Sequence, residues 1–362
     1  MPVDADAIAD CVLAAFDQLP EKRKPRPPPR WVKGLTLTAL AKTASIAAFP
    51  WGNVLHDWHA EVLAIRAFNR FLLDQCLYIS LAPHPTSDWV RQRSEAEHVQ
   101  YEQQAFTIRE DVQIHMYCSE APCGDASMEL IMEAQEDATP WTRPPPTVSD
   151  ASMSSCSLQT EQSALRGRSN FSHLGAVRCK PSRPDAPPTL ILPSSQYVPA
   201  ACARAFSTSG RFENIIDNEW KGGYQWEPFK VQGSSREFDW SRRNIPAGHK
   251  AMPSNLSAVC TPAWQETLIG GVLQGRKQFD PRGASAICRR SMWATATQLA
   301  CVLGWPSSVY MLGQRTYREM KNAETFSPRK QVKQDFKSTA LTGWVKNTGD
   351  DDFELERETG VS

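Results

Sequence analysis

One stretch of the sequence, residues 59–72, constrains the fold more than any other. After His59-Ala60-Glu61 it is apolar on nearly every side of a helix. The apolar residues are Val62, Leu63, Ile65, Ala67, Phe68, Phe71 and Leu72. Gly52-Asn53 supplies a turn before this stretch. We therefore expect a buried helix whose first turn holds His59 and Glu61.

A second informative stretch begins with a strand pattern at residues 111–118. Apolar residues alternate there, at Val112, Ile114, Met116 and Cys118, which is typical of a half-buried strand. A turn at residues 119–122 and a helix over about residues 126–134 should follow. Cys123 is thus expected at a strand-to-helix junction, where the N–H groups of the helix end favour a thiolate.

Together the two stretches carry half of the signature of zinc-dependent deaminases, which runs His-x-Glu and then Pro-Cys-x-x-Cys. Ala126 stands in place of the second cysteine. Imidazole and thiolate are ligands that zinc prefers, so His59 and Cys123 are candidate ligands. Glu61 is the candidate catalytic acid and base, because a carboxylate beside a metal-activated water can carry its proton. The alternative is that His59 and Cys123 are a buried histidine and a buried thiol without a metal.

Composition gives only general information about the class of protein. The 362 residues have no net formal charge, so no global field draws the chain to nucleic acid. No apolar run is long enough to span a membrane. Ten cysteines without regular spacing are typical of reduced thiols. We therefore expect an intracellular protein, either nuclear or cytoplasmic.

Local patterns along the chain predict further elements. A helix is expected over residues 4–19, then a proline-rich segment over 22–30. An exposed loop or disordered insertion is expected at about 140–173, where proline, serine and threonine concentrate. Further strands are expected at 195–198 and 229–232, and further helices after the stretch 283–290 through 302, near 308–321 and near 328–341.

Several stretches resemble the adenosine-to-inosine editases, a family of adenosine deaminases that act on double-stranded RNA or on tRNA. The strongest are residues 53–61, which end in His-Ala-Glu, and Ala121-Pro122-Cys123-Gly124-Asp125. Residues 253–259, 274–277, 283–290 and 343–345 resemble the carboxy-terminal half of the same domain. The resemblance implies an α/β fold: a cytidine-deaminase-like three-layer domain, with a central sheet flanked by helices and a C-terminal helical part. We expect an N-terminal helix and proline-rich segment over 1–30 and a single editase domain over 31–358.

The resemblance implies zinc-dependent hydrolytic deamination of adenosine to inosine, as a tRNA modification next to the anticodon. Because no RNA-binding module precedes the domain, the expected partner is tRNA, and neither DNA nor a membrane. The resemblance also implies a buried inositol hexakisphosphate. Its matching positions here are Arg66, Arg289, Tyr317, Lys321, Lys330 and Trp344. The alternative for the basic residues of the last helices is a solvated face or an RNA-facing patch.

The sequence departs from the family at Leu190-Ile191. The family carries its third zinc ligand in a Ser-Cys-Ser-Asp-Lys-like stretch near this point, and that stretch is missing here. Candidate substitutes are Cys179, Cys202 and Cys118. A stable zinc site usually has at least three protein ligands. The alternative to an active enzyme is therefore a catalytically impaired RNA-binding pseudoenzyme, or a mis-spliced gene model of that enzyme.

Overall fold

The computed structural model describes most of the chain. The described ranges are 4–20, 51–57, 59–81, 86–100, 104–132, 188–215, 220–224, 226–239, 256–305, 314–341 and 350–355, with residues 218, 241 and 310. The chain divides into two compact units. The first unit comprises Met1–Leu19, Gln113–Asn244 and Gln331–Lys346, and the second comprises Pro20–Val112, Ile245–Lys330 and Asn347–Ser362. The single domain expected over 31–358 stays a prediction.

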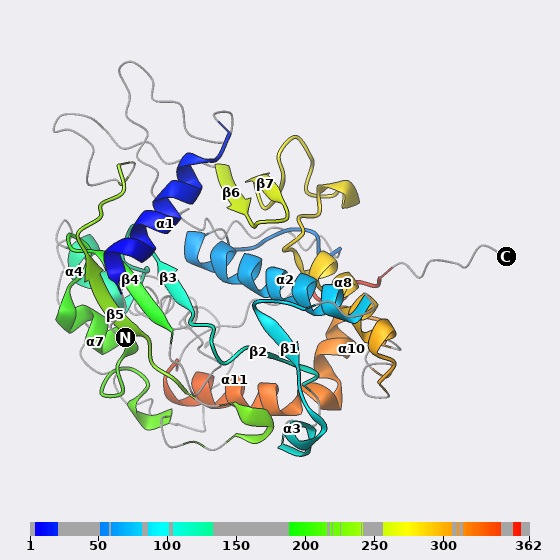
Figure 1. Ribbon diagram of the computed structural model, residues 1–362. Helices are drawn as coiled ribbons and strands as arrows, with labels where there is room; N and C mark the ends of the chain where they lie inside the picture. The colour runs from blue at the N-terminus through cyan, green and yellow to red at the C-terminus, as the bar shows by residue number, and fades with distance from the viewer. Residues whose placement is uncertain are drawn as a thin grey trace, which may run out of the picture. The chain divides into compact units, whose positions relative to one another are not determined.

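A parallel sheet organises the first unit (Figure 1). Its strands are β3 (His115–Tyr117), β4 (Thr189–Pro193) and β5 (Lys230–Ser234), in that order. Every residue of the central strand β4 is buried. Since side chains alternate between the two faces of a strand, both faces of β4 are covered, as parallel sheets require.

Helices supply this cover in the first unit. α1 (Ala5–Asp17) packs against β3 and β5. α7 (Pro199–Phe206) packs against β5 and against the short helix η2 (Asp125–Ser127), which leads into α4 (Met128–Met132). Leu190 and Leu192 of β4 contact the α7 side chains Ala205 and Phe206 in one core cluster. The predicted α/β class, with helices flanking a sheet, is confirmed.

A second core of the first unit is aromatic. It gathers Phe212, Trp226 and Phe336, and Phe336 comes from α11 (Ser327–Thr339), whose residues from Gln331 on belong to this unit. Two single-turn helices lie in the same part of the sequence, η3 (Glu213–Ile215) and η4 (Lys221–Gly223). The second half of α11 is thus held in the first unit by apolar packing.

Two helices and an antiparallel sheet organise the second unit. α2 (Ala60–Leu81) lies beside α8 (Arg289–Leu303) (Figure 1). The sheet consists of β6 (Leu256–Cys260), β7 (Gln265–Ile269) and β8 (Val272–Leu273), and α2 also packs on β6. Leu63 and Ala67 of α2 meet Val259, Leu268 and Ile287 in a shared core.

The smaller elements of the second unit complete it. β1 (Val90–Gln92) and β2 (Phe106–Ile108) form an antiparallel pair, with α3 (Glu95–Gln100) between them in sequence. Towards the C-terminus follow η6 (Pro281–Gly283), α10 (Tyr317–Asn322) and η7 (Glu324–Phe326). Trp293, Met320 and Phe353 form a further core there.

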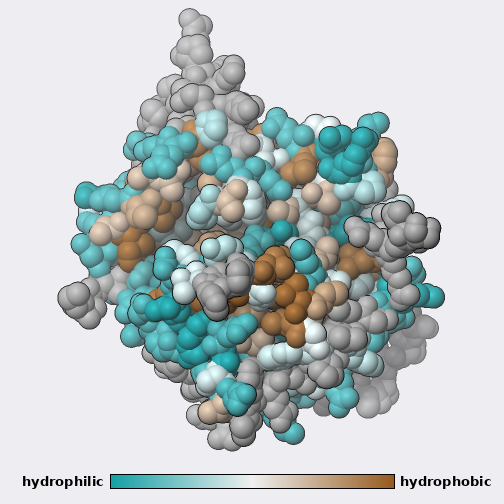
Figure 2. Space-filling view, turned by 45° about the vertical axis from the view of Figure 1, so that its right-hand side comes forward, coloured by the Kyte–Doolittle hydropathy of each residue, from teal (hydrophilic) through white to brown (hydrophobic). Residues whose placement is uncertain are grey.

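Two expectations about these elements are wrong. α2 is buried on one face only, because its apolar surface exceeds what β6 and α8 cover, and Phe68, Tyr78 and Leu81 are 37%, 55% and 59% exposed. On the face seen in Figure 2, apolar residues likewise gather in separate groups among hydrophilic ones. Residues 195–198 are not a strand. They turn the chain from β4 into α7, and Pro199 opens that helix.

Most other elements match the sequence predictions. Helix α1, strands β3 and β5 and helices α2, α8 and α11 lie where the patterns placed them. The helix expected near 308–321 is described only as α10, and residues 22–30 and 140–173 lie outside the described residues. No described helix has the length and apolar character needed to cross a membrane.

Candidate active site

The His-Ala-Glu motif lies where α2 begins. Ala60 is the first residue of the helix, and the carbonyl oxygen of His59 accepts the N–H of Leu63 at 3.0 Å. His59 and Glu61 are both buried, at 5% and 7% exposure. The motif therefore occupies the first helical turn, as the sequence predicts, and both its imidazole and its carboxylate are buried.

Asp57 orients the imidazole of His59. One carboxylate oxygen of Asp57 accepts the backbone N–H of His59 at 3.0 Å and lies 2.7 Å from the ring nitrogen Nδ1. An ionised carboxylate only accepts, so Nδ1 is the donor in this pair and Nε2 is the ring nitrogen left for a ligand. Metal-binding histidines are commonly held in this way by a carboxylate. Sequence reasoning missed Asp57, although an acidic residue two positions before the histidine was a visible signal.

Asp350 holds the segment 52–56, which precedes the motif, by two hydrogen bonds. Its buried carboxylate accepts the N–H of Gly52 at 2.6 Å and lies 2.8 Å from Nε2 of His56. Gly52 has a φ of +66°, and a Cβ atom there would overlap the ring of Phe353. Only glycine meets both conditions. Sequence reasoning missed Asp350 because nothing local links an acidic C-terminal stretch to a turn so far away in the chain.

Cys123 lies in the first unit, between β3 and η2, so the expected strand-to-helix junction is confirmed. Asp125, the first residue of η2, forms an ion pair with Arg211. Nε and Nη2 of Arg211 donate to its two carboxylate oxygens at 2.5 and 3.0 Å. The two side chains are only 1% and 2% exposed. Burial raises the pKa of Asp125, and the Arg211 guanidinium opposes that shift. Sequence reasoning missed Arg211, which lies far along the chain from the cysteine loop.

The candidate substitutes for the third zinc ligand have different surroundings. Cys202 of α7 is buried in the sheet core, and burial raises the pKa of its thiol to about 11. A thiol with that pKa is protonated at neutral pH, which disfavours metal binding. Cys118 is half-buried against the same core, and Cys179 lies outside the described residues. Within the described ranges, no three His, Cys, Asp or Glu side chains are grouped so that they could hold a metal ion.

Five of the six residues expected at the polyanion lie in the second unit: Arg66, Arg289, Tyr317, Lys321 and Lys330. Arg66 donates Nε and Nη2 to the carbonyl oxygen of Ile287 at 2.8 and 2.5 Å, and burial lowers its pKa. Arg289 donates to the carbonyl oxygen of Asp350 at 2.5 Å. The positive charge of Arg289 repels that of Arg66 and lowers the pKa of Arg66 further.

Lys321 is the most perturbed cation of this group. Burial, and then repulsion by Arg329 and Arg289, lower its pKa from 10.5 to about 7. Its ammonium lies 6.0 Å from the centre of the Tyr317 ring and 4.7 Å from that of Phe326. Cations held together in a buried place carry a high desolvation cost that a bound anion would relieve.

The remaining two residues expected at the polyanion are less informative. Lys330 is exposed, and its Nζ donates to the carbonyl oxygen of Asn322 at 2.6 Å. Trp344 lies outside the described residues. Their part in anion binding stays a prediction.

Comparison with known proteins places the chain in a family. The adenosine-deaminase (editase) domain matches residues 42–183, a range that contains His59, Glu61 and Cys123. tRNA-specific adenosine deaminase 1 of Schizosaccharomyces pombe is 31% identical over 337 residues, which is 83% of this chain and 78% of the relative. The chain belongs to the adenosine-deaminase (editase) family.

Two further relatives match this editase over shorter stretches. tRNA-specific adenosine deaminase 1 of Saccharomyces cerevisiae is 30% identical over 141 residues, 38% of this chain and 32% of the relative. Double-stranded RNA-specific editase B2 of Mus musculus is 33% identical over 86 residues, 24% of this chain and 11% of the relative. The editase is thus an adenosine deaminase by family, as the sequence predicts, and the family points to a metal-dependent reaction.

Proposed function

We propose that this editase converts adenosine to inosine in tRNA, next to the anticodon, by a zinc-dependent hydrolysis. The observation that carries the proposal is the buried turn in which Asp57 orients His59 and Glu61 stands on the same helix. Its likeness to a tRNA-specific adenosine deaminase of fission yeast, over most of both chains, supports tRNA as the substrate. Anticodon loops expose unstacked bases, so little energy is needed to bring an adenine into a site.

The residues that would hold zinc are His59, Cys123 and a third ligand. Imidazole and thiol are the donor types that zinc prefers, and His59 is oriented as metal ligands commonly are. The donor types therefore fit, whereas the number of donors grouped within the described residues does not reach three. When bound in such a site, zinc acidifies a water molecule to a pKa near neutrality.

Glu61 is proposed to carry the protons of the reaction. Its carboxylate would take one proton from the attacking water and give it to the ring nitrogen, and would then carry the proton of the newly attached hydroxyl to the amino group, which leaves as ammonia. Glu61 lies two positions after His59, so the two side chains leave the helix in different directions. The imidazole can therefore hold a ligand while the carboxylate reaches over the reacting base. Burial of Glu61 keeps bulk water from this proton transfer.

Inositol hexakisphosphate is proposed as a second bound group, held by the cations of the second unit. Arg66, Arg289, Lys321 and Tyr317 have the chemistry for it, because guanidinium, ammonium and hydroxyl groups all donate to phosphate oxygens. The lowered pKa of Lys321 supports the proposal, since a polyanion would restore the charged form.

The second candidate function is an RNA-binding protein without deaminase activity. It is favoured by one observation, the missing ligand stretch at Leu190-Ile191, together with the raised pKa of the Cys202 thiol. Such a chain would bind tRNA but hold zinc weakly, because fewer than three ligands seldom retain the ion.

Zinc content and inosine formation, measured on the same purified chain with a tRNA substrate, separate the two functions. We expect one zinc ion per chain and inosine in the product nucleosides. Glu61→Gln should lower the rate by about 10²-fold or more, the usual contribution of a general acid and base, and leave zinc content unchanged. Glu95→Gln is the control, because Glu95 is an exposed glutamate in the first turn of another helix, α3. A chain without zinc and without inosine would establish the second function instead.

A further inference from the structure

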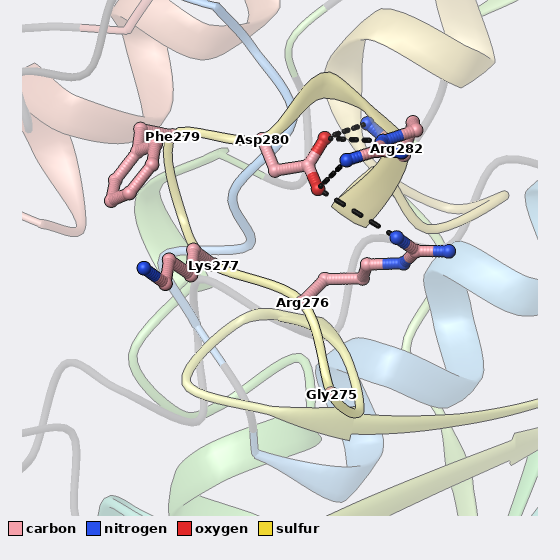
Figure 3. Close-up of a pocket in the computed structure, with 6 residues that line it drawn as sticks. All are labelled: Gly275, Arg276, Lys277, Phe279, Asp280 and Arg282. Atoms are coloured by element: carbon pink, nitrogen blue, oxygen red, sulfur yellow. Dashed lines mark hydrogen bonds and ion pairs between the residues drawn. The ribbon is translucent and has the colours of Figure 1, made fainter.

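A basic loop in the second unit encloses a hollow of about 510 Å³. The loop runs from the end of β8 into η6, and Figure 3 shows the six residues around the hollow. They are Gly275, Arg276, Lys277, Phe279, Asp280 and Arg282. Three of them are cations and one is a carboxylate, so this surface is positive in a chain whose net formal charge is zero. A local positive field of this kind attracts phosphate groups.

The cations of the loop are turned towards solvent. Arg276 and Arg282 approach the same Asp280 carboxylate, at 3.8 and 3.1 Å, and their side chains are 45% and 77% exposed. One carboxylate cannot neutralise two guanidinium groups. Their remaining N–H donors lie at the protein surface, where they can reach a second anion.

An aromatic ring stands among these charges. Phe279 is 56% exposed, and the Lys277 ammonium lies 5.4 Å from its ring centre. Figure 3 shows Phe279 and Lys277 on one side of the loop and the two arginines on the other. Exposed aromatic rings beside basic side chains are how proteins bind single-stranded nucleic acid, by stacking on a base and pairing with its phosphates.

The loop is held in shape by contacts within its own unit. The buried Asn53 amide donates to the carbonyl oxygens of Gln278 and Asp280 at 2.9 and 3.2 Å, and the Gln278 amide donates to that of Gly270 at 2.8 Å. At Gly283 a Cβ atom would come within 3.2 Å of the Lys277 carbonyl oxygen, so the chain approaches itself closely there. A surface fixed before binding loses little entropy when it binds.

These contacts also tie the loop to the candidate active site. Asn53 belongs to the segment that leads into His59 and Glu61, and the N–H of Leu55 in that segment donates to the carbonyl oxygen of Gly271 at 2.9 Å. The loop is therefore hydrogen-bonded directly to the segment that carries the motif.

We propose that the hollow formed by Arg276, Lys277, Phe279 and Arg282 binds single-stranded RNA flanking the adenosine that reacts. One unpaired base stacks on Phe279, and the adjoining phosphates pair with the three cations. This surface rests on the proposed function for its substrate, because it identifies where the RNA loop is held. An acidic protein segment would match the charge but would leave the exposed ring of Phe279 without a stacking partner.

The test is the affinity of the full chain for a fluorescently labelled tRNA anticodon stem-loop, at several salt concentrations. Phe279→Leu should weaken binding about 10-fold, the effect of losing one stacked base, whereas Phe279→Tyr should bind like the unaltered chain. Arg282→Gln should weaken binding and reduce the salt dependence by about 0.7 in the logarithmic slope, as for one lost phosphate contact on a single strand.

The matched control is Arg109→Gln. Arg109 is also exposed, and it also pairs with an aspartate two residues away, Asp111, at 3.2 Å. Its removal should leave RNA affinity unchanged. The proposal is overturned if Phe279→Leu and Arg282→Gln bind RNA as the unaltered chain does, or if an acidic peptide binds and the stem-loop does not.

Inosine formation, measured alongside, keeps the two proposals apart. Loss of RNA affinity in the loop variants supports the RNA-binding hollow even where the unaltered chain makes no inosine. Inosine formation by the unaltered chain, with equal RNA affinity in all variants, retains the deaminase and overturns the hollow.

Discussion

Lys321 provides a measurable link between pH and stability in this editase. Its pKa falls from 10.5 in an unfolded chain to about 7 in the folded one. Between these values the unfolded state binds more protons, so stability rises as pH rises from about 7 to 10.5. Below pH 7 both states are protonated, and the full cost of burying the ammonium is present. A shift of roughly 3.5 units corresponds to about 5 kcal/mol.

The perturbation is Lys321→Met, which removes the charge and keeps an unbranched side chain of similar length. At pH 7 the variant should be more stable than the unaltered chain by up to about 5 kcal/mol, when no polyanion is bound. This advantage should shrink by about 1.4 kcal/mol for each unit of pH above 7. Urea unfolding of ligand-free protein, followed by tryptophan fluorescence across this range, gives both quantities. Lys330→Met is the control, because Lys330 is exposed and should leave the pH profile unchanged.

Added inositol hexakisphosphate should reverse the ranking. Phosphate oxygens around the ammonium restore its charged form, so the unaltered chain should lose its dependence on pH and become more stable than Lys321→Met. Parallel pH profiles for the unaltered chain and Lys321→Met, without ligand, would refute the reasoning. They would mean that the Lys321 ammonium is hydrated in the folded protein and carries no burial cost.

Two further predictions concern the residues that position the candidate ligands. Asp57→Asn should weaken zinc binding about 10- to 100-fold, measured by competition with a chelator, because the amide no longer fixes the proton on Nδ1 of His59; unchanged affinity would remove Asp57 from the site. Arg211→Met should destabilise the chain by about 3–5 kcal/mol in urea, because it leaves the Asp125 carboxylate buried without its partner. The double variant Asp125→Asn/Arg211→Met should recover much of that loss, and equal unfolding midpoints for the single variant and the unaltered chain would contradict the argument.

The sequence predicted those parts of the fold whose causes are local. Alternation in residues 111–118 reflects a half-buried strand, and β3 lies there with all three residues partly buried. Periodic apolar residues predicted α1 and α2 for the same reason. The burial of α2 was overestimated, because periodicity reports where apolar side chains are and not how much neighbouring surface exists to cover them.

The residues of the candidate site likewise differ in whether the local sequence could predict them. His59, Glu61 and Cys123 belong to short motifs in which chemistry and chain position coincide, so they could be read directly. Asp350 and Arg211 act on Gly52 and Asp125 from far away in the sequence. Only the folded chain brings such partners together, since ion pairs between distant residues follow no sequence period.

At Leu190-Ile191, where the sequence differs from the family pattern, folding and metal binding place different requirements on the chain. β4 runs through this point without interruption: Leu190 pairs with Met116 and Val231, and Ile191 with Tyr117 and Gln232. Both side chains are fully buried, on opposite faces of the sheet. Folding here requires only apolar side chains of suitable size in alternation, a condition that many sequences meet. Metal binding requires a particular donor atom at a particular place, and the buried thiol of Cys202 supplies it poorly because its pKa is about 11. The pairing and burial of β4 do not depend on a metal ligand at this point, so zinc content tests the ligand set independently of the fold.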